Sequence, residues 1–492
     1  MRNSLIAVAL LCSASAHADQ SVLTYHGALD RAGRYVVPGL TYDRARGLRL
    51  DPSFHAAFQG KVYAQPLLWR RPGSTEGEVI VATEDNEVFA LDALSGAQIW
   101  KRALGPPVPR STLPCGNISP LGVTGAPVID EQRATLYLDA ATMRANGPRH
   151  EIFALSLTDG SIEPGWPLDV ATALGASFDP SVQNQRGALA LFKGKVFVPF
   201  SGHWGDCGAY HGFVVAVSVD EPGKVSSFST RARGGGIWAQ GGVSGDGQSL
   251  FAVTGNTFGT SGWFGTTGWS DGEAVLRLSP DLSHPTESRD FFAPLDWRDL
   301  DRRDLDLGGT AAIPLDVAGP NGARKLIFAI GKAGEAYLLD RDSLGGVGGA
   351  IASAQVTTNI TIASPAVWSA ADGVFVVLQG DGAHCPPGEP ADSLIALKIR
   401  VDPAPVIETA WCGSVAGAGS PIVTTTDGRS DPIVFVVGAE GDNRLHAFRA
   451  DNGEPLATPP ETMHGLHHFQ TLIAAEDRLY VAADSTVYAF KF

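Results

Sequence analysis

The chain has 492 residues, among them 58 glycines and 32 prolines, with 44% hydrophobic and 18% charged residues. This composition is globular, rich in turns and poor in charge, and a chain of this length divides into domains unless it forms a repeat or barrel architecture. The net charge of −15 argues against a nucleic-acid partner, whose phosphates need a basic surface, and no long Lys/Arg run points to an anionic membrane.

The first 18 residues have the pattern of a secretory signal peptide. An arginine precedes an apolar stretch over residues 5–11, and the small-residue sequence Ala-His-Ala predicts cleavage after Ala18. The apolar stretch is far shorter than the roughly 20 residues that span a bilayer, and the leucine before Cys12 is too bulky for a lipoprotein site. We expect a periplasmic or secreted monomer without a transmembrane segment, with residues 19–492 as a single domain.

Four cysteines remain after removal of the signal peptide: Cys115, Cys207, Cys385 and Cys412. An even number in an oxidising compartment predicts disulfides, and the closeness of Cys385 and Cys412 in the sequence favours that pair. The chain contains no C-x-x-C-H motif for covalent haem and no paired C-x-x-C array for structural zinc.

A short strand motif recurs along the chain and predicts the fold. In "VIVATEDNEVFALDALSGAQIW" (79–100), two apolar strands flank a polar turn, and Ser-Gly leads into a third strand. Related segments return at intervals of roughly 40–65 residues. Their central positions are Ala90, Ala154, Ala216, Arg277, Leu338, Ala396, Ala447 and Ala489.

Short strands, glycine-rich turns, a blade-sized period and the lack of a long amphipathic helix predict an all-β propeller of four-stranded antiparallel blades. We expect eight blades, with seven as the alternative. The last copy reaches the C-terminus after about two strands. A segment near the N-terminus, within residues 20–30 or 60–70, should therefore complete the last blade and close the ring.

The tryptophan-bearing hairpins, with "NEVFALDALSGAQIW", resemble the pyrroloquinoline quinone (PQQ) propeller repeat over nearly the whole mature chain. That superfamily includes calcium- and quinone-dependent alcohol dehydrogenases, and also non-catalytic envelope propellers that help assemble outer-membrane barrels. Since the fold does not decide the function, two hypotheses stand. The chain is a PQQ-type oxidoreductase that acts on an alcohol or related small substrate in the axial channel, or it is a binding or scaffold propeller with a protein partner at its rim.

In the dehydrogenases of this superfamily, the quinone lies flat on a tryptophan, contacts cationic side chains and is activated by Ca²⁺, while an aspartate acts as base. The resemblance implies the same roles for matching residues of this chain. "GKAGEAYLLDRD" places Lys332 where the quinone-contacting cation would lie; the alternative is a solvated or acid-paired lysine. "FAVTGNTFG" places Asn256 as the calcium-ligand asparagine, with an ordinary turn residue as the alternative. Trp238 is the candidate stacking floor, or else a core residue.

The acidic stretch "DLDRRDLDLGGTAAIPL" (299–315) matches the segment that supplies the general base. Asp304 and Asp306 are the best matches, Asp304 also as a calcium ligand, and alternation would point both carboxylates to one side of an extended strand. Mutual repulsion would then raise one pKa. Arg302 and Arg303 could instead neutralise them in a salt-bridged loop.

Two departures from the dehydrogenase pattern weaken the prediction of PQQ and Ca²⁺. The family's adjacent cysteine pair is reduced to Cys115 alone, and the calcium-ligand glutamate position falls on Cys207, with Asp206 one residue away as the remaining candidate ligand. Cys115 and Cys207 belong to successive blades and could form a disulfide at the rim.

The segment "SGHWGDCGAYHGFVVAV" gathers further channel candidates, namely His203, Trp204 and His211, and "MHGLHHFQ" adds His467. Histidines with an acid can bind a transition metal, but this spacing matches no known signature. Arg186, in "DPSVQNQRGAL", is a candidate clamp for a carboxylate of the cofactor, with a surface salt bridge as the alternative.

Overall fold

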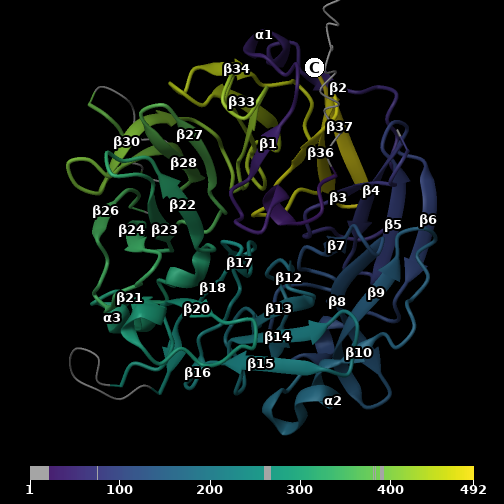
Figure 1. Ribbon diagram of the computed structural model, residues 1–492. Coiled ribbons are helices and arrows are strands. Elements are labelled where there is room, and N and C mark those ends of the chain that lie inside the picture. The colour runs from purple at the N-terminus through teal and green to yellow at the C-terminus, as the bar shows by residue number, and fades with distance from the viewer. Residues whose placement is uncertain are drawn as a thin grey trace, which may run out of the picture.

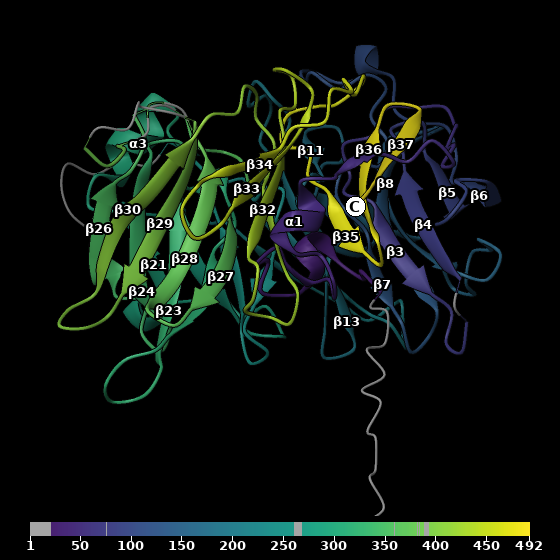
Figure 2. The same cartoon turned by 90° about the horizontal axis from the view of Figure 1, so that it is seen from above.

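The computed structural model describes residues 21–74, 76–259, 268–358, 360–380, 382, 384–387 and 393–492. The predicted signal peptide, with Cys12, lies outside the described residues. Eight antiparallel sheets of four strands stand around a central axis, which confirms the eight-bladed propeller (Figure 1). Seen from the side of the ring, the strands of one blade stand next to one another, as Figure 2 shows for β27–β30.

The blades follow one another in chain order, each from its axial to its outer strand. They are β3 (Leu67–Arg70), β4 (Gly77–Ala82), β5 (Glu87–Asp92) and β6 (Gln98–Ala103); β7 (Val128–Asp130), β8 (Thr135–Arg144), β9 (Gly147–Ser156) and β10 (Leu168–Asp169); β12 (Ala190–Phe192), β13 (Lys195–Gly202), β14 (Phe213–Ser218) and β15 (Val225–Ser229); β17 (Ser244–Gly245), β18 (Leu250–Val253), β20 (Val275–Leu278) and β21 (Phe291–Ala293); β22 (Ile313–Val317), β23 (Arg324–Ile330), β24 (Glu335–Asp340) and β26 (Ala352–Gln355); β27 (Ala366–Ala370), β28 (Gly373–Gln379), β29 (Leu394–Arg400) and β30 (Val406–Gly413); β31 (Ile422–Thr425), β32 (Ile433–Val437), β33 (Leu445–Arg449) and β34 (Pro455–Ala457); and β35 (Ile473–Ala475), β36 (Arg478–Ala483), β37 (Thr486–Lys491) and β2 (Arg49–Leu50).

The recurring sequence motif is the third strand of each blade. Its central residue pairs in register with a large apolar residue of the second strand, as Ala90 does with Ile80 and Ala447 with Phe435. A small side chain here leaves room for the larger neighbour, and the faces of adjacent blades then interlock into continuous apolar clusters that leave the strands almost wholly buried.

Two tryptophans of outer strands join neighbouring blades in the same way. Trp100 of β6 donates its indole N–H to the carbonyl of Leu157, 3.0 Å away, and its ring lies against Gly160, where a Cβ would come within 2.5 Å. Trp411 of β30, the outer strand of the sixth blade, repeats this contact and donates to the carbonyl of Ala450 at 2.7 Å. Each indole ring fills the space between two sheets, and its one polar atom, the ring nitrogen, has a hydrogen-bond partner.

The ring is closed by a segment that the sequence did not indicate. β2 (Arg49–Leu50) pairs antiparallel with β37 and forms the fourth strand of the last blade, so the prediction that residues 20–30 or 60–70 would do this is wrong. Residues 67–70 instead form the first strand of the first blade. A two-residue strand with one exposed arginine carries little pattern, which is why it escapes a reading of the sequence.

Residues 22–37 run across the inside of the ring, where Figure 1 shows the N-terminal segment in purple. The backbone of this segment hydrogen-bonds to axial strands on several sides of the ring, and β1 (Arg34–Val36) pairs parallel with β31. Arg31 is 1% exposed and donates to the carbonyls of Val243 and Leu189. The stacked rings of Tyr25 and His26 reach Gln240 and Thr471. The chain itself therefore fills the axial channel at this level.

The helices are short and lie outside the sheets. They are α1 (Tyr42–Ala45), α2 (Val170–Leu174) and α3 (Trp297–Arg303), together with 3-10 turns η1 (Tyr25–Gly27), η2 (Arg110–Thr112), η3 (Gly175–Ser177), η4 (Ser288–Asp290) and η5 (Leu307–Gly309). Within the described ranges, no helix has both the length and the apolar character needed to cross a membrane. Strands β11 (Gln183–Asn184), β16 (Arg233–Gly234), β19 (Thr257–Phe258) and β25 (Gly346–Val347) extend or link blades at the rim.

Candidate functional site

A cavity of about 520 Å³ opens where the axial strands begin and the second-to-third-strand turns meet. Its walls come from nine separate stretches of the chain between residues 117 and 469. The lining residues are Asn117, Asn184, Arg186, Ser201, Gly202, His203, Trp204, Gly205, Asp206, Tyr210, Gly236, Trp238, Asn256, Asp304, Asp306, Lys332, Ile360, Ile362, His468 and Phe469. Nine of the eleven residues that the sequence analysis singled out lie here, among them Asp206, the candidate ligand next to the expected glutamate position.

The glycines on either side of Lys332 allow the backbone to place this residue at the cavity. It lies in the turn between β23 and β24, where Gly331 passes so close to the carbonyl of Asp306 that a Cβ would come within 2.3 Å. Gly334 takes a φ of +71° and closes the turn through a hydrogen bond to Gly331. The Lys332 amide donates to the Asp306 carbonyl at 2.9 Å, so the lysine is fixed to the acidic segment by its backbone as well as by its side chain.

Asp306, which is 4% exposed, is the centre of a hydrogen-bond network. Its Oδ2 lies 2.7 Å from Lys332 Nζ and accepts the indole N–H of Trp238 at 3.1 Å, while Oδ1 accepts the backbone N–H of Asn256 at 2.8 Å. Lys332 Nζ lies 5.3 Å from the centroid of the Trp238 ring. Burial raises the pKa of Asp306 and the neighbouring ammonium lowers it, with a raised pKa as the net result.

Asp304 also meets Lys332, with Oδ1 2.8 Å from Nζ, but its side chain is 64% exposed. The prediction that Asp304 and Asp306 alternate along an extended strand is wrong. Asp304 caps the C-terminus of α3 in the left-handed conformation, and Asp306 precedes the 3-10 turn η5. Arg302 and Arg303 pair with Asp299, so they do not neutralise the two candidate bases.

Two acids behind this network were not found from the sequence. Glu273 is fully buried and accepts the backbone N–H of Leu307 at 2.6 Å, and burial raises its pKa well above the usual range. Asp301 accepts the N–H and the hydroxyl of Thr257, and burial raises its pKa to about 6. Asp301 belongs to the acidic stretch that supplied Asp304, so that pattern contained a signal for it.

Arg186 forms the opposite wall. Its guanidinium lies 4.9 Å from the centroid of Phe469, its Nε is buried without a hydrogen-bond partner, and it forms no salt bridge within the part of the chain that the structure describes. The surface salt bridge considered as an alternative is therefore not formed there. Behind Arg186 lies the buried Glu84, whose carboxylate accepts from Gly122 N and Thr124 Oγ1, and burial raises the pKa of Glu84 to about 7.

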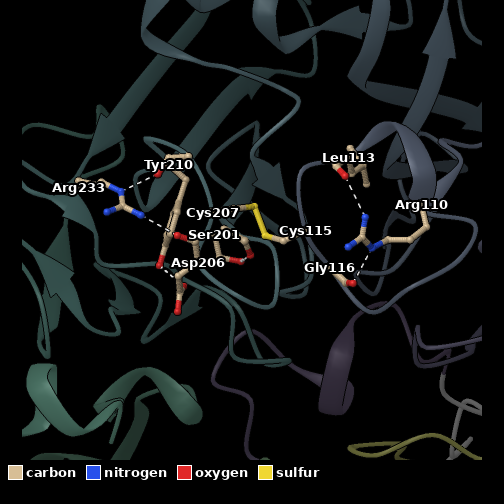
Figure 3. The surroundings of a disulfide bond; sticks show 11 residues. Arg110, Leu113, Cys115, Gly116, Ser201, Asp206, Cys207, Tyr210 and Arg233 are labelled. Carbon is tan, nitrogen blue, oxygen red and sulfur yellow. Dashed lines mark hydrogen bonds between the residues drawn. A yellow bond between two sulfur atoms is a disulfide. The ribbon is translucent and has the colours of Figure 1, made fainter.

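The 201–211 loop forms the third wall and is held by a disulfide between Cys115 and Cys207, with Cα atoms 6.0 Å apart (Figure 3). The predicted rim disulfide is thus present, as is the pair Cys385–Cys412. Asp206 accepts the hydroxyl of Tyr210 at 2.6 Å, and its carbonyl accepts from Arg233. These bonds turn the Asp206 carboxylate toward the loop, and Trp204 stands 72% exposed at the mouth of the cavity.

Two predicted candidates lie outside the cavity lining. His211 contacts the carbonyl of Thr230 at 2.9 Å, and His467 contacts Asp484 at 2.9 Å and stacks on Tyr63. Its neighbour His468 lines the cavity instead and contacts Glu440 at 2.7 Å. Within the described residues no three His, Cys, Asp or Glu side chains gather in a way that could bind a metal ion.

The side chains of this cavity fit a quinone but do not fit a calcium ion. An aromatic wall at Trp238 and a cation at Lys332 match a flat, electron-poor, anionic ring. Calcium takes six to eight oxygen ligands, yet the ammonium of Lys332 already lies between Asp304 and Asp306, and Asp206 is bound to Tyr210. The predicted set of Asn256, Asp304 and Asp206 therefore offers fewer unshared oxygens than Ca²⁺ takes.

A larger hollow of about 600 Å³ lies on the opposite face, around the β35–β36 turn. Its charged side chains are paired with one another or with neighbours, Arg478 with Asp51 and Arg34 with Asp30. The first pair joins β36 to the residue that follows β2, and the second lies within the N-terminal segment. Among the residues that line it, this hollow brings together no cluster comparable to the one around Lys332.

Comparison with known proteins agrees with this architecture. The sequence model of the family described as outer membrane protein assembly factor BamB matches residues 55–203. No curated protein matches the chain in a sequence search. The structure is similar to quinohemoprotein alcohol dehydrogenase from Comamonas testosteroni, with a TM-score of 0.66 and 16% identity over 96% of this chain and 80% of that one.

A europium-containing methanol dehydrogenase superposes with a TM-score of 0.65 and 15% identity over 96% of this chain and 98% of that one. BamB from Moraxella catarrhalis gives a TM-score of 0.52 and 14% identity over 90% of this chain and 100% of that one. Such low identities establish the fold alone. The match of residues 55–203 to this family model and the eight-bladed ring both agree with the resemblance to the PQQ-like propeller repeat.

Proposed function

We propose that the protein is an exported quinone-dependent oxidoreductase, with residues 19–492 as one propeller domain and its site in the cavity around Lys332. The observation that carries the proposal is the fixed position of the Lys332 ammonium, 5.3 Å from the Trp238 ring centroid and anchored by two carboxylates. The two disulfides favour an oxidising compartment, which supports export to the periplasm or beyond.

Trp238 would bind the flat face of the quinone, and its orientation is fixed because its indole N–H is bound to Asp306. Lys332 would place a positive charge at a quinone oxygen, a role for which a metal ion is not needed because the cation belongs to the chain. The ammonium is largely buried, with 15% of its side chain exposed, so its charge acts in a medium less polar than water. A bound quinone supplies the two-electron acceptor for an alcohol.

Asp304 is the better of the two predicted bases. The carboxylate of Asp306 is buried and shared among three donors, whereas Asp304 lines the cavity and has oxygen lone pairs free beyond its contact with Lys332. A general base must reach the proton that it removes. Asp304 would take the hydroxyl proton of the substrate, and Asp306 would hold Lys332, Trp238 and Asn256 in place.

Titration of the purified protein with PQQ tests this proposal. Tryptophan fluorescence should report saturable binding at micromolar PQQ in the presence of EDTA, and dye-coupled alcohol oxidation should follow. Lys332→Met should weaken binding, and Lys398→Met, which removes a lysine from an exposed pair with Asp372, should leave it unchanged. Absence of PQQ binding by the folded protein, or binding only with added Ca²⁺, would overturn the proposal.

A scaffold role in the cell envelope is the second candidate. The match of residues 55–203 to the BamB family favours it, and so do Trp204 and Ile360, which stand 72% and 54% exposed at the mouth of the cavity. A protein partner at this rim would cover both side chains. This role would be favoured over catalysis by two results together. The tryptophan fluorescence would stay unchanged on addition of PQQ, and the protein would capture an envelope protein that Trp204→Ser no longer captures.

A further inference from the structure

Three polar groups at one end of the cavity lack a hydrogen-bond partner among the residues that the structure describes. They are the Nε2 atom of His203, the Oδ1 atom of Asn184 and the Nε atom of Arg186. His203 and Asn184 are 3% and 6% exposed, and all three residues line the cavity. A buried polar atom without a partner costs about 1–3 kcal/mol. Three of them on one wall therefore indicate a site built for a polar ligand.

His203 presents an acceptor to this space. Nε2 of His203 has no hydrogen-bond partner, and the backbone of Ser181 acts on the ring in a way that favours the protonated form. Burial lowers the pKa of His203 to about 4, which keeps the imidazole neutral at neutral pH. We assign the single proton of the neutral ring to Nδ1, which leaves a lone pair on Nε2. Asn184 adds a carbonyl oxygen, and both acceptors require donors on the ligand.

Arg186 supplies the opposite charge. It forms no salt bridge in the described part of the chain, although its guanidinium is packed on Phe469. Two acids act on its charge. Glu84 has both oxygens bound, to Thr124 and Gly122, and its pKa of about 7 leaves it partly neutral, while Glu440 is paired with His468. A guanidinium without an ion-pair partner at a cavity wall is suited to a carboxylate, which it can bind through two parallel hydrogen bonds.

We propose that this end of the cavity binds a hydroxycarboxylate, with the carboxylate on Arg186 and hydroxyl groups donating to His203 Nε2 and Asn184 Oδ1. This inference deepens the proposed function, on which it rests for the reaction: the ligand is the alcohol substrate, and its class is that of hydroxy acids or sugar acids. The quinone would occupy the Trp238 and Lys332 end, so the two ligands use different walls of the same cavity.

The test separates the two ligand features with three probes. D-gluconate carries hydroxyls and a carboxylate, D-glucitol carries hydroxyls alone, and hexanoate carries a carboxylate alone. Calorimetric titration of the full-length mature protein, without PQQ, should give an affinity for gluconate at least about tenfold above that for either control, since each feature contributes a charge-assisted or neutral hydrogen bond. Because PQQ is omitted, gluconate binding without PQQ binding would refute the oxidoreductase while leaving this site intact.

Variants assign each feature to its residue. Arg186→Gln should remove the preference for gluconate over glucitol, and His203→Phe should remove the preference for gluconate over hexanoate. His203→Gln, which keeps an acceptor, should restore part of the latter, a rescue that a merely structural role would not give. Arg302→Gln and His55→Gln, both at exposed positions, are the matched controls. Equal binding of gluconate and glucitol, or no gluconate binding up to about 10 mM, would overturn the inference.

Discussion

Replacement of Lys332 by methionine tests the network that defines the site. The variant removes an ammonium whose side chain is 15% exposed and leaves Asp306, 5% exposed, with the N–H donors of Trp238 and Asn256 but no cation. Breaking a buried ion pair from one side costs about 3–5 kcal/mol. Because Asp306 keeps two donors and can take up a proton, we expect the lower end of that range at pH 7.

The assay is urea and thermal unfolding of the ligand-free protein. A loss of about 3 kcal/mol corresponds to roughly 3 °C in Tm for a chain of this length, since the unfolding entropy grows with the number of residues. Lys332 lowers the pKa of Asp306, so its stabilisation is present at neutral pH and decreases as the pH falls and Asp306 becomes protonated. The gap between wild type and variant should therefore narrow from pH 7 toward pH 4.

Two further variants make the result interpretable. Lys332→Met/Asp306→Asn should recover part of the lost stability, because it no longer buries an unpaired charge. Lys398→Met, from an exposed pair, should cost no more than about 1 kcal/mol. A loss below about 1 kcal/mol in Lys332→Met, or a gap that widens on acidification, would show that the lysine and Asp306 do not form the pair described.

Three other predictions address the ring. His26, fully buried at the axis, has its pKa lowered to about 3 by burial. The unfolded state binds the proton more tightly, so the free energy of unfolding of the wild type should fall between pH 6.5 and 3 by up to about 5 kcal/mol more than that of His26→Gln. Unfolding titrations measure this difference, and parallel pH curves for the two proteins would contradict it. Gly160→Ala should destabilise by more than Gly147→Ala, although both glycines have positive φ, because only at Gly160 would the new Cβ strike a tryptophan ring; equal losses in thermal unfolding would exclude a packing role. Cys115→Ser/Cys207→Ser, which opens a loop of 92 residues, should cost about 4–5 kcal/mol in urea unfolding, and no change would argue against a stabilising crosslink.

The number of blades could be read from the sequence because the repeat recurs in every blade at the same structural position. Each copy is a third strand, and in six of the eight copies its central residue is an alanine that faces a larger residue on the second strand, as at Ala90 and Ile80. Because packing between neighbouring sheets repeats this pattern around the ring, it survives even where single strands are ambiguous. The closing strand Arg49–Leu50 has no such repetition, and its position follows from contact with the C-terminal strand alone.

The candidate site was predicted in part. The family resemblance pointed to Lys332, Trp238 and Asn256 as residues of one cofactor site, and the cavity contains all three. His211 and His467 were singled out by composition, but a strand pairing and an acid contact take them out of the cavity. Glu273 and Asp301 were missed, since a single acid among apolar residues, or within an acidic run, does not show where its side chain will be buried.

The sequence by itself predicted the eight-bladed ring, favoured the Cys385–Cys412 pair, allowed a Cys115–Cys207 disulfide, and showed the unusual cation between two glycines in "GKAGEA". Those features are local or repeated, so propensity and periodicity reveal them. Only the tertiary structure decided that residues 22–37 close the axis, that Asp304 and Asp306 both meet Lys332 although no strand joins them, and that Arg186 and His203 face one cavity. Each of these depends on which distant segments the closed ring brings together, and hydrophobic patterning along the chain contains no record of that.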